Sequence, residues 1–333
     1  MPKNKIIAIS FTDLHIHPFQ LFNENDRRLK TSLRCLKYIG SVAEKLKVPV
    51  LFGGDLYHNP QELKNRVNSQ TLKYFHKYFE LKGIPFIAIS GNHDMAEKNY
   101  LEHRSPSHLE SFTHFKKFKL IDFDYFDTPH FTVFGIPYLN SEDELVKAIK
   151  ITSKKALETS TLGGRILMLH TDLPGAKTPA GFELKEYAEN FNLKKLFKVF
   201  DLVFCGHIHK PQLILGNVIM GGSPIHQVQS DAGTQMGYWE IYQDFSTKLI
   251  PLNDKFPTFK YVGENLLSQK PKDDKDYWLP VPVATEAPED GSSFNTKVST
   301  KKLVKAYTQQ IGEKRKFYKN TLLKTLIEAK NNA

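Results

Sequence analysis

Residues 84–94 read IPFIAISGNHD, an apolar run that stops at a glycine and continues with an amide, an imidazole and a carboxylate. The run Ile84–Ile89 is rich in β-branched and aromatic residues, which predicts a buried strand. Gly91 lets the backbone turn sharply where a side chain would clash. Asn92, His93 and Asp94 then stand at the carboxyl end of that strand, where α/β proteins place their chemistry. Taken alone, the Gly-Asn-His tripeptide also fits an ordinary turn.

Four other predicted strands end in the same way. Apolar runs at 5–12, 48–52, 165–169 and 201–205 each lead into side chains that commonly bind metals. Those side chains are Asp13 and His15, then Asp55, then His170, and finally His207 and His209. Helical spacing of apolar residues at 26–46 and 63–81 separates the first three strands, so the order is β-α-β-α-β. This order predicts a layered α/β fold with a site along one sheet edge.

The remaining pattern predicts the rest of the fold. Further helices are expected at 107–118, after Ser141 and at 184–197, and further strands at 119–125 and 131–138. Ser141 precedes three acidic residues, which is typical of a helix start. The runs 212–220, 237–242 and 247–252 are expected to be antiparallel strands that complete a second sheet.

Composition restricts the class of protein. The chain has 333 residues with 40% hydrophobic content, and no run approaches the ~18 apolar residues that a membrane span needs. The first residues show no signal-peptide pattern, and two cysteines form no disulfide framework, so a reducing cytoplasm is expected. The net charge is +10, and residues 296–333 hold ten Lys and Arg against two Glu, which is +8 of it. The basic character is therefore concentrated in the C-terminal tail.

The strand-end residues have the chemistry of a metal centre. Two carboxylates, one amide and four imidazoles suit Mn²⁺, Fe²⁺ or Zn²⁺. Seven ligands are too many for one ion and suit two, with one carboxylate as a bridge, and two such ions clamp a phosphate for in-line attack. Each histidine alone is more often a packing or surface residue than a ligand, but five strand ends with this character outweigh that interpretation.

These motifs together resemble the calcineurin-like metallophosphoesterases. The resemblance covers residues 5–255 and rests on Asp13-Leu14-His15, Gly54-Asp55, Gly91-Asn92-His93-Asp94, His170 and Gly206-His207-Ile208-His209. It implies a four-layer αββα sandwich with a dinuclear site. One ion would be held by Asp13, His15, Asp55 and His209, and the other by Asp55, Asn92, His170 and His207. His93 would stabilise the transition state or protonate the leaving oxygen, and Asp94 would orient His93.

Within the superfamily, the chain is most similar to the SbcD-type nucleases of DNA double-strand-break processing, including their phage versions. Gly54-Asp55-Leu56-Tyr57-His58 has that group's GD-Leu-aromatic-His form, which makes His58 a candidate substrate contact or else a packing histidine. The stretches 170–177 (HTDLPGAK) and 222–227 (GSPIHQ) also resemble this group. The resemblance implies an exonuclease or endonuclease that acts on DNA in repair and recombination, with Mn²⁺ as the expected metal.

The change of composition after Pro257, the helical spacing of apolar residues after Ser299 and the resemblance together predict an organisation and partners. Residues 1–255 would form the nuclease domain, 256–295 a linker or minimal cap, and 296–333 a helical hairpin. The hairpin would dock on an SbcC-type coiled-coil ABC ATPase, although a basic helix packed on its own domain has the same pattern. A homodimer through the helices after Asp13 and Asp55 is expected from the family alone.

Two other functions use the same features. A small-molecule or nucleotide phosphoesterase would need the same metals, but it has no use for a basic helical tail. A non-catalytic scaffold with this fold would not need to retain all seven ligands and His93.

Overall fold

The computed structural model describes residues 4–58, 63–95, 106–161, 163–184, 192–271 and 274–280. Residues up to Val281 belong to one compact unit. The hairpin expected at 296–333 and the end of the expected linker lie outside the described residues. None of the helices in the described part of the chain is both long and apolar enough to cross a membrane.

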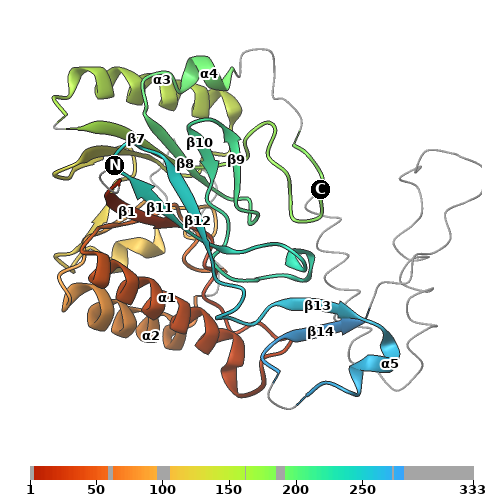
Figure 1. Ribbon diagram of the computed structural model, residues 1–333. Helices are drawn as coiled ribbons and strands as arrows, with labels where there is room; N and C mark the ends of the chain where they lie inside the picture. The colour runs from red at the N-terminus through yellow and green to blue at the C-terminus, as the bar shows by residue number, and fades with distance from the viewer. Residues whose placement is uncertain are drawn as a thin grey trace, which may run out of the picture. The chain divides into compact units, whose positions relative to one another are not determined.

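Two six-stranded sheets form the centre of the fold (Figure 1). The strands of the first, in spatial order, are β12 (Thr247–Pro251), β11 (Gly237–Tyr242), β1 (Ile6–Phe11), β2 (Val50–Phe52), β3 (Phe86–Ala88) and β4 (Phe118–Leu120). The strands of the second are β5 (Tyr125–Asp127), β6 (Phe131–Ile136), β7 (Gly164–His170), β8 (Leu202–Gly206), β10 (Val218–Met220) and β9 (Gln212–Leu215). The run β1 to β4 is parallel, as is the run β6, β7, β8 and β10. Each parallel run brings its carboxyl ends to one edge.

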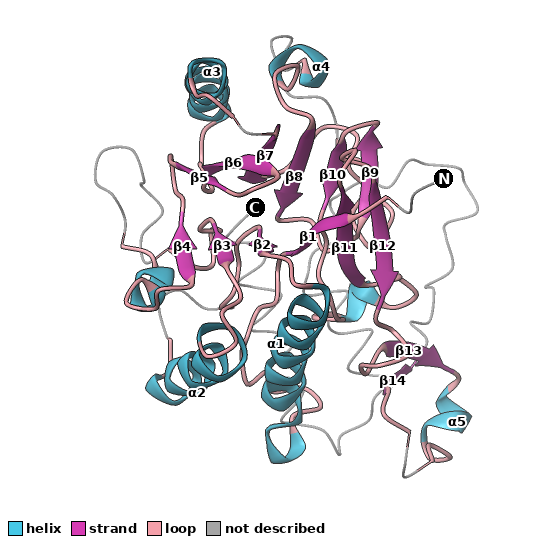
Figure 2. Ribbon diagram, turned by 60° about the vertical axis from the view of Figure 1, so that its left-hand side comes forward, coloured by secondary structure: helices cyan, strands magenta, loops and turns pink. Residues whose placement is uncertain are grey.

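Helices cover the outer face of each sheet (Figure 2). On the first sheet lie α1 (Arg27–Leu46) and α2 (Asn65–Phe75), and α2 continues into the π-helical turn η2 (His76–Glu80). On the second lie α3 (Glu142–Glu158) and the short α4 (Leu193–Leu196). Single 3₁₀ turns occur at Glu24–Asp26, His108–Phe112 and Gln229–Asp231. The architecture is therefore the four-layer αββα sandwich that the family resemblance implies.

Successive side chains of the central strands face different cores, which explains the layers. In β7, Ile166 and Met168 face the core between the two sheets, whereas Leu167 and Leu169 face the core under α3. Because successive side chains of a strand point to opposite faces, a strand covered on both sides is apolar throughout. Three separate cores result: one under α1 and α2, one between the sheets, and one under α3 and α4.

A small third sheet follows the sandwich. Strands β13 (Phe259–Val262) and β14 (Tyr277–Pro280) pair in parallel, with α5 (Glu264–Leu267) between them. Phe259, Tyr277 and Leu279 pack there against Leu21 and Phe22 from the loop after β1. The expected linker or cap thus starts with an ordered segment of its own.

Several expected elements differ from the structure. Strand β11 pairs with β1 and β12 pairs with β11, so both belong to the first sheet instead of completing the second. The run 212–220 is a β9–β10 hairpin, and the expected strand 119–125 is divided between β4 and β5 in different sheets. The helix expected at 107–118 is only a 3₁₀ turn, and within 184–197 the described helix is α4 alone. Ser141 does cap α3, since its side chain accepts the N–H of Glu144.

Candidate metal centre

The backbone at four of the expected ligands lies in the left-handed region. The φ angles are 53° at Asp13, 44° at His15, 60° at Asp55 and 100° at His207. Non-glycine residues adopt such angles uncommonly, and they do so mainly where the surrounding structure holds them in place. These turns let the chain end a strand and still direct side chains back to the sheet edge.

Hydrogen bonds between the loops hold these turns. The N–H of Asp13 donates to the carbonyl of Gly54 at 2.9 Å, and the N–H of His15 donates to the carbonyl of Asp55 at 3.0 Å. Gly91 meets the same loop so closely that a Cβ there would lie 2.1 Å from Oδ1 of Asp55. Only glycine therefore fits at position 91 with the loops in this arrangement.

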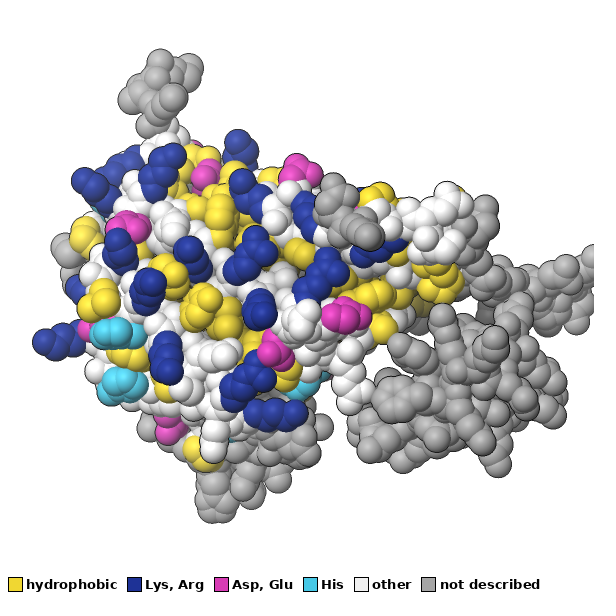
Figure 3. All heavy atoms as spheres, turned by 90° about the horizontal axis from the view of Figure 1, so that it is seen from below, with side chains coloured by type: hydrophobic (Ala, Val, Ile, Leu, Met, Phe, Trp, Pro, Cys, Tyr) yellow, Lys and Arg dark blue, Asp and Glu magenta, His cyan; other side chains and the backbone are white. Residues whose placement is uncertain are grey.

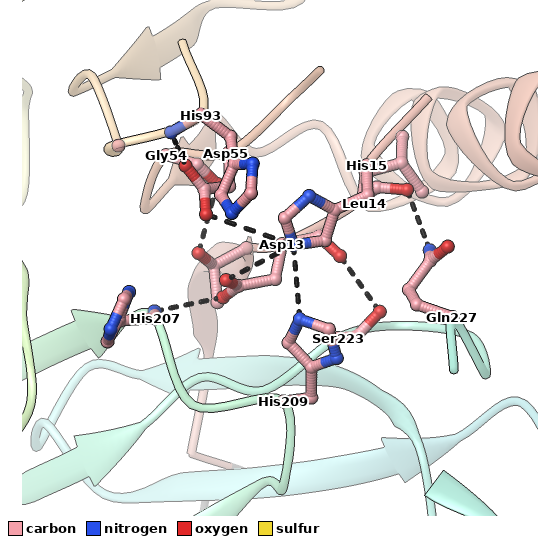
Figure 4. A network of polar contacts seen from close by, with 12 residues as sticks. Asp13, Leu14, His15, Gly54, Asp55, His93, His207, His209, Ser223 and Gln227 are labelled. Atoms are coloured by element: carbon pink, nitrogen blue, oxygen red, sulfur yellow. Dashed lines mark hydrogen bonds and ion pairs between the residues drawn. The ribbon is translucent and has the colours of Figure 1, made fainter. Parts of the chain in front are cut away.

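One group of side chains gathers Asp13, His15 and His209. The Nε2 atoms of His15 and His209 are 3.0 Å apart, and Nε2 of His15 lies 3.8 Å from Oδ1 of Asp13. Figure 4 shows these side chains turned toward a common centre. Asp13 and His15 are buried, and His209 is partly exposed.

A second group gathers Asp55, His170 and His207, with Asn92 beside them. Nε2 of His170 lies 3.3 Å from Oδ2 of Asp55 and 3.1 Å from Oδ1 of Asn92. Nδ1 of His207 is also 3.1 Å from Oδ1 of Asn92. Two carboxylates, one amide oxygen and four imidazoles from five strand ends thus share one region.

In Asp13 and in Asp55, one carboxylate oxygen accepts a backbone N–H and the other oxygen is turned toward the site (Figure 4). Oδ1 of Asp55 accepts the N–H of His93 at 2.8 Å, and Oδ2 of Asp13 accepts the N–H of His207 at 3.1 Å. Oδ2 of Asp55 is 3.3 Å from His170 in one group and 3.8 Å from His15 in the other. That oxygen is therefore placed to bridge the two groups.

The donor set fits metal ions. Oδ1 of Asp13 is buried and has no hydrogen-bond partner among the described residues, although buried polar atoms are nearly always paired. The Nε2 atoms of His15 and His209 face each other, and two ring nitrogens that both accept form no hydrogen bond. A divalent cation would satisfy all three atoms, and imidazole with carboxylate suits first-row metals.

Similarity to known proteins agrees with this geometry. The sequence profile described as calcineurin-like phosphoesterase matches residues 9–211, which include every residue of the two groups. The chain belongs to the calcineurin-like phosphoesterase family. Within the matched residues lie both groups of side chains that could hold a metal ion.

Individual relatives of the chain are distant. The chain is 26% identical over 274 residues to Uncharacterized protein R555 of Acanthamoeba polyphaga mimivirus. That match covers 78% of this chain and 19% of the viral protein, so the chain spans about a fifth of that relative's length.

Solved structures show distant likenesses as well. A dimetal phosphatase from Danio rerio has a TM-score of 0.45 at 11% identity, covering 72% of this chain and 93% of its own. A hypothetical protein from Thermus thermophilus has a TM-score of 0.37 at 10% identity, with 65% and 75% covered. Purple acid phosphatase PPD1 from yellow lupin (Lupinus luteus) has a TM-score of 0.36 at 14% identity, with 68% and 41% covered.

Hydrogen bonds to backbone carbonyls fix the orientation of two of the imidazoles. Nδ1 of His170 faces the carbonyl of Gly53 at 2.7 Å, and Nδ1 of His15 faces the carbonyl of Tyr57 at 3.3 Å. A ring nitrogen that donates to a carbonyl leaves the other as an acceptor, which selects the tautomer that binds metal. Both Nε2 atoms are therefore directed at the site.

Two carboxylates that the sequence analysis missed act on the remaining imidazoles. Oδ1 of Asp231 lies 3.6 Å from Nδ1 of His209, and Oδ1 of Asp172 lies 3.4 Å from Nε2 of His207. The sequence does indicate Asp172, since it stands two residues after His170 at the same strand end. No sequence pattern indicates Asp231, because it comes from the 3₁₀ turn after β10.

Burial and charge set the protonation of the centre. Burial lowers the pKa of His15 well below its ordinary value and so favours the neutral ring that binds metal. Burial acts the same way on His170, but the carboxylate of Asp55 outweighs it and raises the pKa of His170 to about 9. Burial alone would raise the pKa of Asp55, and the neighbouring His170 instead holds it well below its usual range.

His93 and His58 form a pair at the open side of the site. Their rings stack with centroids 5.4 Å apart, and the ring of His93 lies 4.9 Å from that of His15. Nδ1 of His93 faces the carbonyl of His58 at 2.5 Å, which leaves its Nε2 to act. The ring of His58 also packs on Phe19 and His17, and burial lowers its pKa to about 3. His58 thus supports His93 through both its carbonyl and its ring.

Asp94, which is expected to orient His93, contacts the backbone of the loop that carries Asp55. Its buried carboxylate accepts the N–H groups of Asp55, Leu56, Tyr57 and Gly91 at 2.7–3.2 Å. The orienting acceptor for His93 is the carbonyl of His58. Asp94 therefore fixes the loop that carries Asp55 and His58, because four backbone donors converge on it.

The histidines outside the two groups have other surroundings. His226 is buried and structural: its Nε2 faces the carbonyl of Thr234, and its Nδ1 accepts the N–H of Phe259. His17 belongs to the ring cluster around His58. His76 and His114 lie away from the site beside Phe115.

Proposed function

We propose that the two groups of side chains bind two divalent metal ions that share Asp55. One ion would have Asp13, His15, Asp55 and His209 as ligands, and the other Asp55, Asn92, His170 and His207. Mn²⁺ is the expected ion, with Fe²⁺ and Zn²⁺ as alternatives that the same donors accept. When bound, such a pair supplies Lewis-acid polarisation of a phosphoryl group and lowers the pKa of water.

We infer that His93 transfers a proton to the leaving oxygen. Its Nδ1 is engaged by the carbonyl of His58, so its Nε2 is the atom available at the site. The ring is partly exposed, whereas Asp13, His15, Asp55 and His170 beneath it are buried. A substrate phosphate therefore meets His93 from the solvent side, where a positioned acid is useful.

We propose that the substrate is DNA and that the protein is the nuclease subunit of an SbcCD-type complex. The observation that supports this most is the pairing of His93 with His58, the histidine of the GD-Leu-aromatic-His motif that resembles the SbcD-type group. The excess of basic residues adds attraction for phosphates. The basic tail at 296–333 would bind the SbcC-type ATPase.

Hydrolysis of two substrates by the full chain tests this function. Purified protein with Mn²⁺ should cleave linear double-stranded DNA as well as bis-p-nitrophenyl phosphate. His93→Ala should retain both metals and lose turnover on DNA by about 10²–10⁴, with a smaller loss on bis-p-nitrophenyl phosphate, because p-nitrophenolate leaves without needing a proton. His76→Ala, at an exposed histidine away from the site, is the matched control and should keep full activity.

The outcomes separate the candidate functions. Cleavage of the small ester alone, also after addition of the SbcC-type ATPase, would contradict the nuclease and favour a small-molecule phosphoesterase. Full activity of His93→Ala would remove His93 from the mechanism.

A further inference from the structure

The outer face of α1 and α2 is densely basic. Its exposed side chains on α1 recur at helical spacing and include Lys30, Arg34, Lys37 and Lys45. On the neighbouring helix, Lys73 of α2 and Lys77 of η2 are exposed as well. We call these six residues the basic face. Figure 3, which looks at the side where α1 and α2 lie in Figure 1, shows Lys and Arg predominating there over Asp and Glu.

Acidic side chains of the same segment do not neutralise this face. Outside the metal centre, the described acids between residues 26 and 80 are Asp26, Glu44 and Glu80. Asp26 pairs with Arg66, and Glu44 pairs with Lys82 at 2.8 Å. The carboxylate of Glu80 accepts the N–H groups of Lys116 and Lys117. Each acid is thus engaged elsewhere, and the six cations of the basic face have no carboxylate partner among the described residues.

The two rows of cations adjoin one another. Nζ of Lys37 and Nζ of Lys77 each lie 5.5 Å from the ring centroid of Tyr78. From Lys30 to Lys45 the helix rises about 22 Å at 1.5 Å per residue. This length corresponds to about six base pairs of duplex at 3.4 Å each. The rows therefore present an extended line of charge instead of a single anion site.

The composition of the face argues against a protein partner or a second copy. The cores of protein interfaces are rich in aromatic and apolar residues and poor in lysine. Of the large hydrophobic residues that are exposed in the described chain, Leu81 is the one that borders this face. The homodimer through α1 and α2 that the family resemblance implies would place the basic face against its own copy, where like charges repel, so the inference made here competes with that expectation.

We infer that the basic face binds the phosphate backbone of double-stranded DNA, away from the metal centre. This inference rests on the proposed nuclease function and adds a second contact to it. The metal centre lies at the carboxyl edge of the strands, whereas the basic face lies on the outer side of the first sheet. A duplex held there is anchored independently of the phosphate that undergoes hydrolysis.

Salt-dependent binding by full-length protein tests the inference. The face variant is K30Q/R34Q/K37Q, and the matched control is K147Q/K150Q/K154Q, three exposed lysines of α3 on the opposite layer. A labelled duplex of about 30 base pairs is titrated by fluorescence anisotropy at several salt concentrations, with EDTA present to prevent cleavage. The C-terminal tail is present in every protein, so differences arise from the substituted side chains.

The face variant should weaken duplex binding about 10-fold or more and reduce the salt slope by about 3, since each phosphate contact contributes about 0.9. The control should match the wild type. Three results would overturn the inference: an unchanged slope in the face variant, a loss of binding to anionic phospholipid vesicles with duplex binding intact, or conversion of a dimer to a monomer in sedimentation.

This test is separate from that of the proposed function. Hydrolysis of bis-p-nitrophenyl phosphate with Mn²⁺ should be equal in all three proteins, because none of the six substituted residues lies at the metal centre. A failure of the wild type to cleave DNA would contradict the nuclease, whereas equal duplex binding by all three proteins would contradict the basic face.

Discussion

At the scale of single residues, Asp55 is the side chain on which both metal positions depend. Its Oδ2 lies within 3.8 Å of His15 in one group and within 3.3 Å of His170 in the other. Asp55→Asn keeps the shape and removes the negative charge that would be shared by two cations. We expect the variant to lose both ions, so that metal analysis after desalting falls from about two ions per chain toward none.

The control for this change is Asp244→Asn, which alters a carboxylate in the turn between β11 and β12. It should retain the wild-type metal content. Retention of one ion by Asp55→Asn would show that Asp55 serves a single metal position.

A second single residue, Asp94, is expected to contribute to the free energy of unfolding. Its carboxylate accepts four backbone N–H groups in a fully buried position. In Asp94→Asn the amide NH₂ would face donors in place of an acceptor, which leaves buried N–H groups unsatisfied. We expect the free energy of unfolding to fall by about 2–4 kcal/mol in urea titrations. Unchanged stability with lower turnover would instead support the orientation of His93 by Asp94.

At the scale of elements, the strands that carry the site could be predicted from the sequence, and their sheet partners could not. Runs such as Ile84–Ile89 are apolar on both faces because each strand is covered twice, and this is visible in a single sequence. Sheet membership of β11 and β12 depends on pairing with β1, more than 200 residues away. No local pattern records that pairing.

For the site as well, the sequence predicts some features and not others. Ligand-type residues at strand ends are visible because parallel strands direct their carboxyl ends to one edge. The position of Asp231 beside His209, and the carbonyl of His58 that faces His93, arise from loops whose course the sequence does not specify. The expectation for Asp94 rested on its place next to His93 in the sequence, whereas three of the four N–H groups that it accepts come from the loop after β2.

The β13–β14 element permits a prediction about pH. Burial would raise the pKa of Asp276, but its bonds to Lys260 and Thr258 outweigh burial and lower it. A carboxyl whose folded pKa is lowered stabilises the element above the unfolded pKa of about 3.9, and this contribution is lost as the pH falls through the folded value. The element should therefore detach at acid pH.

Trp278 on β14 reports this change, since Trp239 can be replaced by phenylalanine to leave a single tryptophan. Its fluorescence should change with a midpoint below about pH 4, the ordinary range of aspartate. Asp276→Asn should show the detached signal already at neutral pH and little further dependence on acid. The same acid transition in both proteins would assign the pH dependence to another group.

At the scale of the whole molecule, the metal centre and most of the net positive charge belong to different parts of the chain. Residues up to Val281 form a compact unit that holds the metal centre and the basic face. The segment 296–333 carries +8 of the net charge of +10 in the sequence. Catalysis and partner binding are therefore expected to be separable.

Truncation after Asn295 tests this separation. The truncated chain should hydrolyse bis-p-nitrophenyl phosphate like the full chain, because every proposed ligand lies before residue 210. It should no longer bind the SbcC-type ATPase in a sedimentation or pull-down experiment with purified components. In the full chain, Leu322→Asp should have the same effect, because Tyr318, Leu322 and Leu326 recur at helical spacing and the variant puts a charge among them, whereas Lys324→Gln should not. Binding of the ATPase by the truncated chain would assign the contact to the compact unit, and the tail would then act on DNA alone.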